Sequence, residues 1–117
     1  MKENIIKEKS YSFAVRIVKL NKYLIKEHKE YVLSKQILKS GTSVGANIEE
    51  ANSGQSKKDF IAKLSISLKE AKETHYWLRL LFDCEYIDKA IFDSLLFDCN
   101  EIIIILTKIL KSSKENL

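Results

Sequence analysis

Proline is absent from this 117-residue chain, and its three glycines all lie within residues 41–54. Sheet proteins need turn residues about every ten positions, so a chain that lacks them is expected to form helices. A single domain of this length can bury a core without disulfides or a bound metal. We therefore predict one all-α domain over residues 1–117, folded as an antiparallel up-down-up-down four-helix bundle with short connections.

The spacing of apolar and capping residues predicts four helices, at about residues 12–29, 33–53, 56–84 and 88–112. Gly54 is expected to end the second helix. Ser56 and Asp59 have the spacing of a capping box at the start of the third, and Asp88 is expected to cap the fourth. The first ten residues are charged and show no period, so we expect them to be frayed, like residues 113–117.

The predicted second helix contains two glycines, Gly41 and Gly45, and each interior glycine costs roughly 1 kcal/mol relative to alanine. We expect a neighbouring backbone to lie close to both, where a side chain would not fit. Beside the apolar seam of this helix runs a stripe of small and polar residues: Gln36, Ser40, Ser43, Asn47 and Glu50.

The predicted third helix carries a stripe that can face this polar stripe: Ile66, Glu70, Glu73 and Trp77. Buried carboxylates require hydrogen-bonding partners. We therefore expect Glu70 and Glu73 to bond to the hydroxyls and amide of Ser40, Ser43 and Asn47, or else to lysines of a neighbouring chain.

The predicted fourth helix has apolar residues over about half of its circumference, whereas a bundle helix needs an apolar arc of only about 100°. These residues are Ile91, Phe92, Leu95, Leu96, Cys99, Ile102, Ile103, Ile105, Leu106, Ile109 and Leu110. Monomers rarely leave such a surface in water. We predict a homo-oligomer with this helix, or the polar stripes of the second and third helices, at the contact. Coverage by the first helix is the alternative.

No arrangement of residues points to catalysis. The two histidines, His28 and His75, lie on different predicted helices, and neither has the glutamate three residues earlier that a di-iron bundle requires. No glycine loop is available to cradle a phosphate, because Gly41 and Gly45 are predicted to lie inside a helix. We predict no enzymatic activity, no catalytic residue, no metal, no cofactor and no small-molecule substrate.

The chain has no apolar run of about 18 residues and no signal-peptide pattern, which predicts a soluble, cytoplasmic protein without a membrane segment. Its two cysteines fit that compartment. Cys84 and Cys99 are expected to lie roughly 16 Å apart on neighbouring helices, beyond the reach of a disulfide. We predict that both are free, buried thiols.

Positive charge is concentrated in the first third of the chain. The net charge is +4, yet residues 1–39 hold ten lysines and arginines against four glutamates. A stripe of basic residues on the predicted first helix can neutralise nucleic-acid phosphates: Arg16, Lys19, Lys22, Lys26 and Lys29. The same stripe is also typical of the solvated face of an ordinary amphipathic helix.

Two long motifs resemble a known family. Residues 34–51 (SKQILKSGTSVGANIEEA), and residues 58–60 together with 64–78, resemble the signatures of the bacterial four-helix-bundle proteins encoded in intervening sequences of 23S rRNA genes. The resemblance implies an up-down bundle assembled as a ring-like homopentamer. The positions carried over from the motifs are Ser40, Ser43, Asn47, Glu49, Glu50, Glu70, Glu73 and Trp77, and the resemblance implies a catalytic role for none of them.

Two classes of function remain open at this point. In the first, a pentamer gathers five lysine stripes into a basic surface that binds rRNA or another structured nucleic acid. In the second, the protein is a structural or interaction protein that serves as an accessory subunit to a protein partner. A group related to the resembled family acts in this second way, as an accessory protein to a reverse transcriptase.

Overall fold

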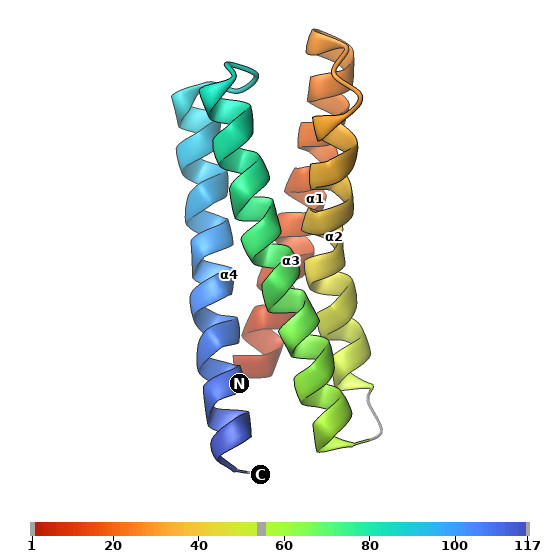
Figure 1. Cartoon of the computed structure of the whole chain (residues 1–117), viewed down its shortest axis with the longest axis vertical. Helices are drawn as coiled ribbons and strands as arrows, with labels where there is room; N and C mark the ends of the chain where they lie inside the picture. The colour runs from red at the N-terminus through yellow and green to blue at the C-terminus, as the bar shows by residue number, and fades with distance from the viewer. Residues whose placement is uncertain (1, 54–55, 117) are drawn as a thin grey trace.

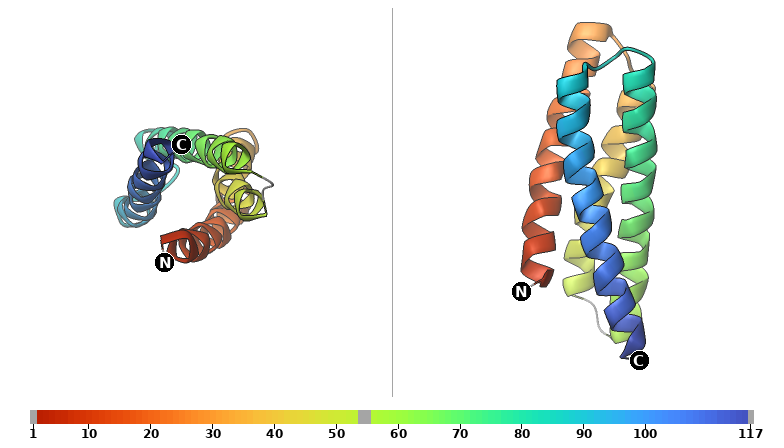
Figure 2. Two further views of the ribbon diagram at one scale, coloured as in Figure 1. Left: turned by 90° about the horizontal axis from the view of Figure 1, so that it is seen from below. Right: turned by 90° about the vertical axis from the view of Figure 1, so that its left-hand side faces the viewer.

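Four helices make up the computed structural model, which describes residues 2–53 and 56–116 and the side chains from residue 5 onward. They are α1 (Lys2–His28), α2 (Leu33–Asn52), α3 (Lys57–Asp83) and α4 (Lys89–Glu115). The helices run alternately up and down in a rod of 47 × 21 × 19 Å (Figure 1). α1 packs on α2, α2 on α3 and α3 on α4, and α4 returns to α1 (Figure 2). The predicted all-α antiparallel bundle is confirmed.

Capping side chains start the third and fourth helices as predicted. Ser56 Oγ accepts the backbone N–H of Asp59 at 3.0 Å. Asp88 Oδ1 accepts the N–H of Ile91 at 2.8 Å. The observed bounds of α2 and α3 lie within one residue of the predicted ones, but the expected end at Gly54 lies outside the described residues.

The first and last helices are longer than predicted, because the first turns of α1 and the last turn of α4 contact other parts of the bundle. The prediction that residues 1–10 are frayed is wrong for the described part, since α1 begins at Lys2. Ile6 and Ser10 continue the buried stripe of Phe13, and each is only 1% exposed. At the other end, α4 continues to Glu115, and Lys57 Nζ donates to the carbonyl of Asn116 at 3.1 Å.

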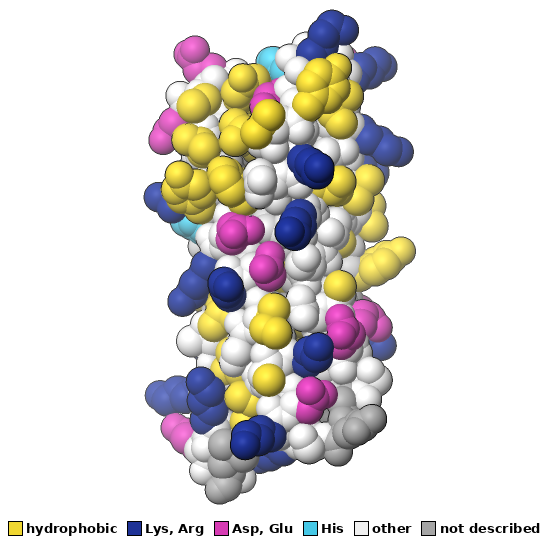
Figure 3. All heavy atoms as spheres, turned by 45° about the vertical axis from the view of Figure 1, so that its right-hand side comes forward, with side chains coloured by type: hydrophobic (Ala, Val, Ile, Leu, Met, Phe, Trp, Pro, Cys, Tyr) yellow, Lys and Arg dark blue, Asp and Glu magenta, His cyan; other side chains and the backbone are white. Residues whose placement is uncertain are grey.

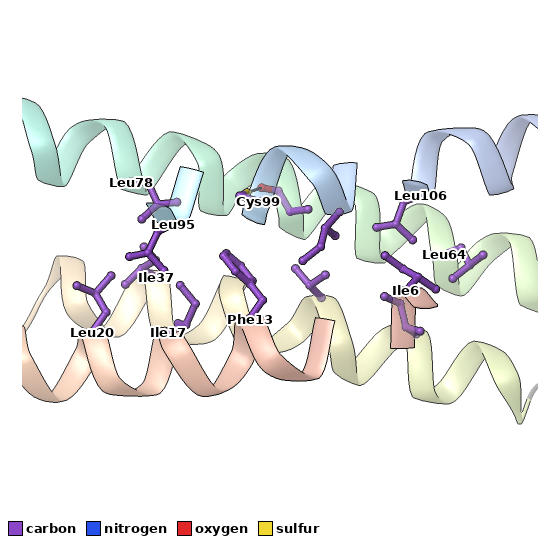
Figure 4. Close-up of a cluster of buried hydrophobic side chains, with 14 of the residues drawn as sticks. Ile6, Phe13, Ile17, Leu20, Ile37, Leu64, Leu78, Leu95, Cys99 and Leu106 are labelled. Atoms are coloured by element: carbon purple, nitrogen blue, oxygen red, sulfur yellow. Dashed lines mark hydrogen bonds between the residues drawn. The ribbon is translucent and has the colours of Figure 1, made fainter. Parts of the chain in front are cut away.

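The core is a column of aliphatic side chains contributed by all four helices. On α3 the buried residues recur at alternating spacings of three and four: Leu64, Ser67, Ala71, Thr74, Leu78 and Leu81. Figure 4 shows side chains from opposite helices pointing toward one another along the whole column, with Ile6 beside Leu64 and Leu106 at one end. The hydroxyl of Ser67 is accommodated because it donates to the carbonyl of Val44 at 2.7 Å.

The two glycines of α2 mark the closest approach of α1, in different ways. A Cβ at Gly45 would lie 3.3 Å from the backbone carbonyl oxygen of Ser10, so a neighbouring backbone is close there, as expected. A Cβ at Gly41 would lie 2.8 Å from both Cγ atoms of Ile17. At Gly41 the neighbour is therefore a side chain, and the expectation of a close backbone is wrong at this position.

Gly41→Ala is expected to lower the free energy of unfolding by about 1 kcal/mol. Overpacking a core costs roughly 1–3 kcal/mol, and the β-branched Ile17 is too stiff to move aside cheaply. This cost exceeds the gain of about 1 kcal/mol from replacing a helical glycine. Denaturant unfolding measures the change, with the exposed Ala46→Gly as a control for helix propensity alone. A more stable Gly41→Ala protein would contradict the close contact with Ile17.

The eleven apolar residues of α4 were predicted to form a surface too wide for one chain to cover, but they are covered within the bundle. Six are buried and the other five are half-buried, packed against α1 and α3. These residues therefore do not need a second subunit, and the alternative of coverage within the chain fits them better. The large apolar side chains of α4 that do remain exposed are Phe97 (68%) and Ile104 (54%), seven residues apart on the outer face.

The two cysteines are both free, but they differ in exposure. Cys99 is buried and its thiol donates to the carbonyl of Ala71 at 3.3 Å. Burial, with a smaller effect from the charge of Asp98, raises the pKa of Cys99 to about 12. Cys84 is exposed just after the end of α3, so the prediction of two buried thiols is wrong for this residue.

Candidate nucleic-acid interface

The predicted lysine stripe lies on the outer face of α1. Lys19, Lys22 and Lys26 are exposed, and Lys29 is exposed directly after the last residue of the helix. None of the four lysines forms an ion pair with any residue of the described part of the chain. Their ammonium groups are therefore free of protein carboxylates, which is the condition for contacting phosphates.

Arg16 differs from these lysines, although it was predicted with them. Its guanidinium donates to Asp98 Oδ2 of α4 at 2.6 Å and to Ser94 Oγ at 2.8 Å. A second bond, from Lys9 Nζ to Glu101 Oε1 at 3.0 Å, joins the same two helices. Arg16 therefore closes the seam between α1 and α4, and its charge is largely neutralised there.

Two further lysines, missed by the sequence reasoning, extend the basic surface onto α2. Lys35 and Lys39 are exposed in the first two turns of that helix. Because α1 and α2 are antiparallel, the start of α2 returns beside the end of α1. We name this surface the basic end, and it comprises Lys19, Lys22, Lys26, Lys29, Lys35 and Lys39. The excess of positive charge before residue 40 was the signal that could have found it.

Acidic residues are few within the segment that carries this charge, but other helices bring carboxylates close to it. The charge of Lys39 acts on Glu70 of α3. Asp83 and Glu85 line one pocket with His28 of α1. Residues 19–39 contain two acidic residues, Glu27 and Glu30, against the six lysines. The Glu30 carboxylate accepts the backbone N–H groups of Val32 at 3.3 Å and of Ser34 at 2.8 Å. Figure 3 shows Lys and Arg side chains gathered at the upper right, over the hairpin that joins α1 to α2, next to hydrophobic side chains.

The family-motif residues of α2 hold the bundle together. Ser40 is fully buried and accepts a hydrogen bond from Thr74 Oγ1 of α3 at 2.9 Å. Glu49 pairs with Lys7 of α1 at 3.4 Å, and Glu50 pairs with Lys63 of α3 at 3.2 Å. These two neighbouring glutamates thus join α2 to the helices on either side of it.

The predicted hydrogen bonds of Glu70 and Glu73 to α2 are wrong. Ser43 Oγ donates to the carbonyl of Lys39 at 2.6 Å, and Asn47 Nδ2 donates to the carbonyl of Ser43 at 2.8 Å. Both side chains therefore bond within their own helix. Bonds from these glutamates to lysines of a neighbouring chain stay a prediction.

The glutamate stripe of α3 is partly shielded from water. Burial, together with the charge of Glu73, raises the pKa of Glu70, while Lys69 and Lys39 act in the opposite direction. Trp77 lies on the same stripe, and its ring meets Tyr76 edge-on at 5.1 Å. The buried Nε1 of Trp77 has no hydrogen-bond acceptor among the described residues.

Nothing in the described residues groups three or more potential ligands around a metal position. None of α1 to α4, over the residues that the structure describes, combines the length and the apolarity that a membrane crossing requires.

Comparison with known proteins supports the family resemblance that the two sequence motifs indicate. A crystal structure of a protein of unknown function, from the S23 ribosomal protein family of Bacteroides thetaiotaomicron, is 57% identical to this chain with a TM-score of 0.93. The match covers 95% of this chain and 99% of that one. No curated protein matches. The model of the family described as 23S rRNA-intervening sequence protein matches residues 2–108, and the chain belongs to this family.

Proposed function

We propose that this protein is a non-catalytic, cytoplasmic nucleic-acid-binding protein that contacts rRNA or another structured nucleic acid through the basic end. The observation that carries the proposal is the set of six exposed lysines within residues 19–39, a segment with only two glutamates. None of the six has an ion-pair partner in the described chain. A surface of this kind attracts polyanions without reading base edges. The family description names 23S rRNA, which makes rRNA the first nucleic acid to test.

We also propose that the protein acts as a homo-oligomer, with five copies expected from the family resemblance. Phe97 and Ile104 support this proposal, because two large apolar side chains on one face of α4 are more than half exposed. An oligomer would present several basic ends to one nucleic acid, and linked sites bind more tightly than single ones. The same apolar face supports the second candidate function, an accessory subunit that binds a protein partner.

Titration of labelled 23S rRNA fragments with the wild-type protein tests the proposal. If about six phosphates are neutralised, the affinity should fall roughly 1,000-fold between about 50 and about 200 mM salt. Fragments of unrelated sequence should bind similarly. Absence of binding even at low salt would reject nucleic-acid binding and favour the accessory-subunit function.

A further inference from the structure

The tip of the α1–α2 hairpin holds an aromatic ring in solvent. Tyr31 is 58% exposed and Val32 is 69% exposed, in the four-residue segment 29–32 between α1 and α2. Lys29 lies two residues before Tyr31, and Lys35 lies four residues after it. The hairpin that carries the basic end therefore also carries an exposed aromatic side chain, with a lysine close to it in the sequence on either side.

This tip is fixed rather than loose. The Glu30 carboxylate accepts the N–H groups of Val32 and Ser34, and Ser34 Oγ donates back to the Glu30 carbonyl at 2.6 Å. Asn21 Nδ2 of α1 donates to the carbonyl of Ser34 at 3.1 Å. Lys29 turns the chain with a φ of 50°. These contacts fix the backbone on either side of Tyr31, so less backbone freedom is lost when a partner packs on its ring.

The chemistry of the tip selects its partner. A nucleotide consists of a flat base and a sugar that carries a phosphate. The Tyr31 ring offers a surface on which the base can stack, and the lysines near it in the sequence can bind the phosphate. Bases within a duplex are already stacked on each other, whereas bases in single strands and loops are free to stack on a side chain. A neutral apolar partner would gain nothing from the surrounding positive charge.

We propose that Tyr31 stacks on an unpaired base, so that the basic end prefers single-stranded or looped nucleotides to a continuous duplex. This inference rests on the proposed nucleic-acid binding and narrows its substrate class. Lysine contacts supply affinity for any strand, and Tyr31 supplies the preference for unpaired bases.

The test compares a labelled single-stranded RNA with a blunt duplex of the same length and composition. Tyr31→Ala is expected to weaken single-strand binding roughly 5- to 150-fold, the range found for loss of one base–aromatic stack, and to leave duplex binding unchanged. Tyr31→Phe keeps the ring and should bind as the wild type does. Tyr11→Ala is the matched control, because Tyr11 is 69% exposed on the other half of α1, roughly 27 Å along the helix from Lys29.

The outcomes separate this inference from the proposed function. Unchanged single-strand binding by Tyr31→Ala, or equal losses for strand and duplex, would overturn the stacking inference while wild-type binding kept the proposed function. No binding of either RNA by the wild type would overturn both. Circular dichroism of Tyr31→Ala should show a native helical fold, since the side chain is mostly outside the core.

Discussion

Changing Lys19, Lys22 and Lys26 together to glutamate is expected to abolish RNA binding and to leave the bundle folded. The three side chains are exposed and unpaired in the described chain, so their replacement removes no ion pair there. Loss of about three phosphate contacts should lower the salt slope of log K by about 3 and the affinity at least about 100-fold at low salt. Fluorescence anisotropy over a salt series measures both quantities.

A second triple variant distinguishes the effect of charge at the basic end on RNA binding from the effect of the net charge of the protein. Lys58, Lys108 and Lys111 are exposed, and they lie outside the α1–α2 hairpin. Their replacement by glutamate changes three charges by −2 each, so both variants take the net charge from +4 to −2. The control variant should retain most of the binding. Equal losses in the two variants would mean that net charge, not the basic end, governs the interaction.

The double variant Phe97→Glu, Ile104→Glu is expected to convert the proposed oligomer to a monomer of 13.5 kDa. Both side chains are more than half exposed on the outer face of α4, so charged replacements should not disturb the core of one chain. In a subunit contact they would bury unpaired charges, and hot-spot side chains at interfaces contribute about 2 kcal/mol or more each. Sedimentation velocity at micromolar concentration gives the mass.

The matched control for this variant adds the same charge at exposed small residues, Ala46→Glu with Ala62→Glu, and should remain oligomeric. A wild-type protein that sediments as a monomer would reject the oligomer. An oligomer that persists in the Phe97, Ile104 double variant would place the contact elsewhere, with the stripe of Glu70, Glu73 and Trp77 as the next surface to change.

The interior of the helices was predictable from the sequence, and their ends were not. The spacing of apolar residues predicts the helices whose inner faces are buried in α1, α2 and α3. The capping residues Ser56 and Asp88 predict where α3 and α4 begin. Ile6, Ser10 and Phe13 continue the same spacing toward the N-terminus, but the surrounding charges conceal it. Of these charges, Lys7 and Lys9 lie at the two edges of the inner face of α1, where they pair with Glu49 and Glu101 and do not oppose its burial.

The candidate site was predictable only in part, because its remaining features depend on contacts between distant residues. The carboxylate that neutralises Arg16 is 82 residues away, on α4. Lys35 and Tyr31 join the lysines of α1 only because the chain reverses between α1 and α2. Ser43 and Asn47 bond to carbonyls of their own helix, a local alternative that competes with the predicted bonds to Glu70 and Glu73.

Lysine footprinting tests whether the basic end is the nucleic-acid surface without altering the sequence of the protein. The wild type is acetylated with and without saturating RNA, and mass spectrometry gives the modification of each lysine. RNA is expected to protect the lysines of the basic end, Lys19, Lys22, Lys26, Lys29, Lys35 and Lys39, while Lys58, Lys108 and Lys111 react as they do without RNA. Equal protection of both sets, or protection confined to the second, would contradict this expectation.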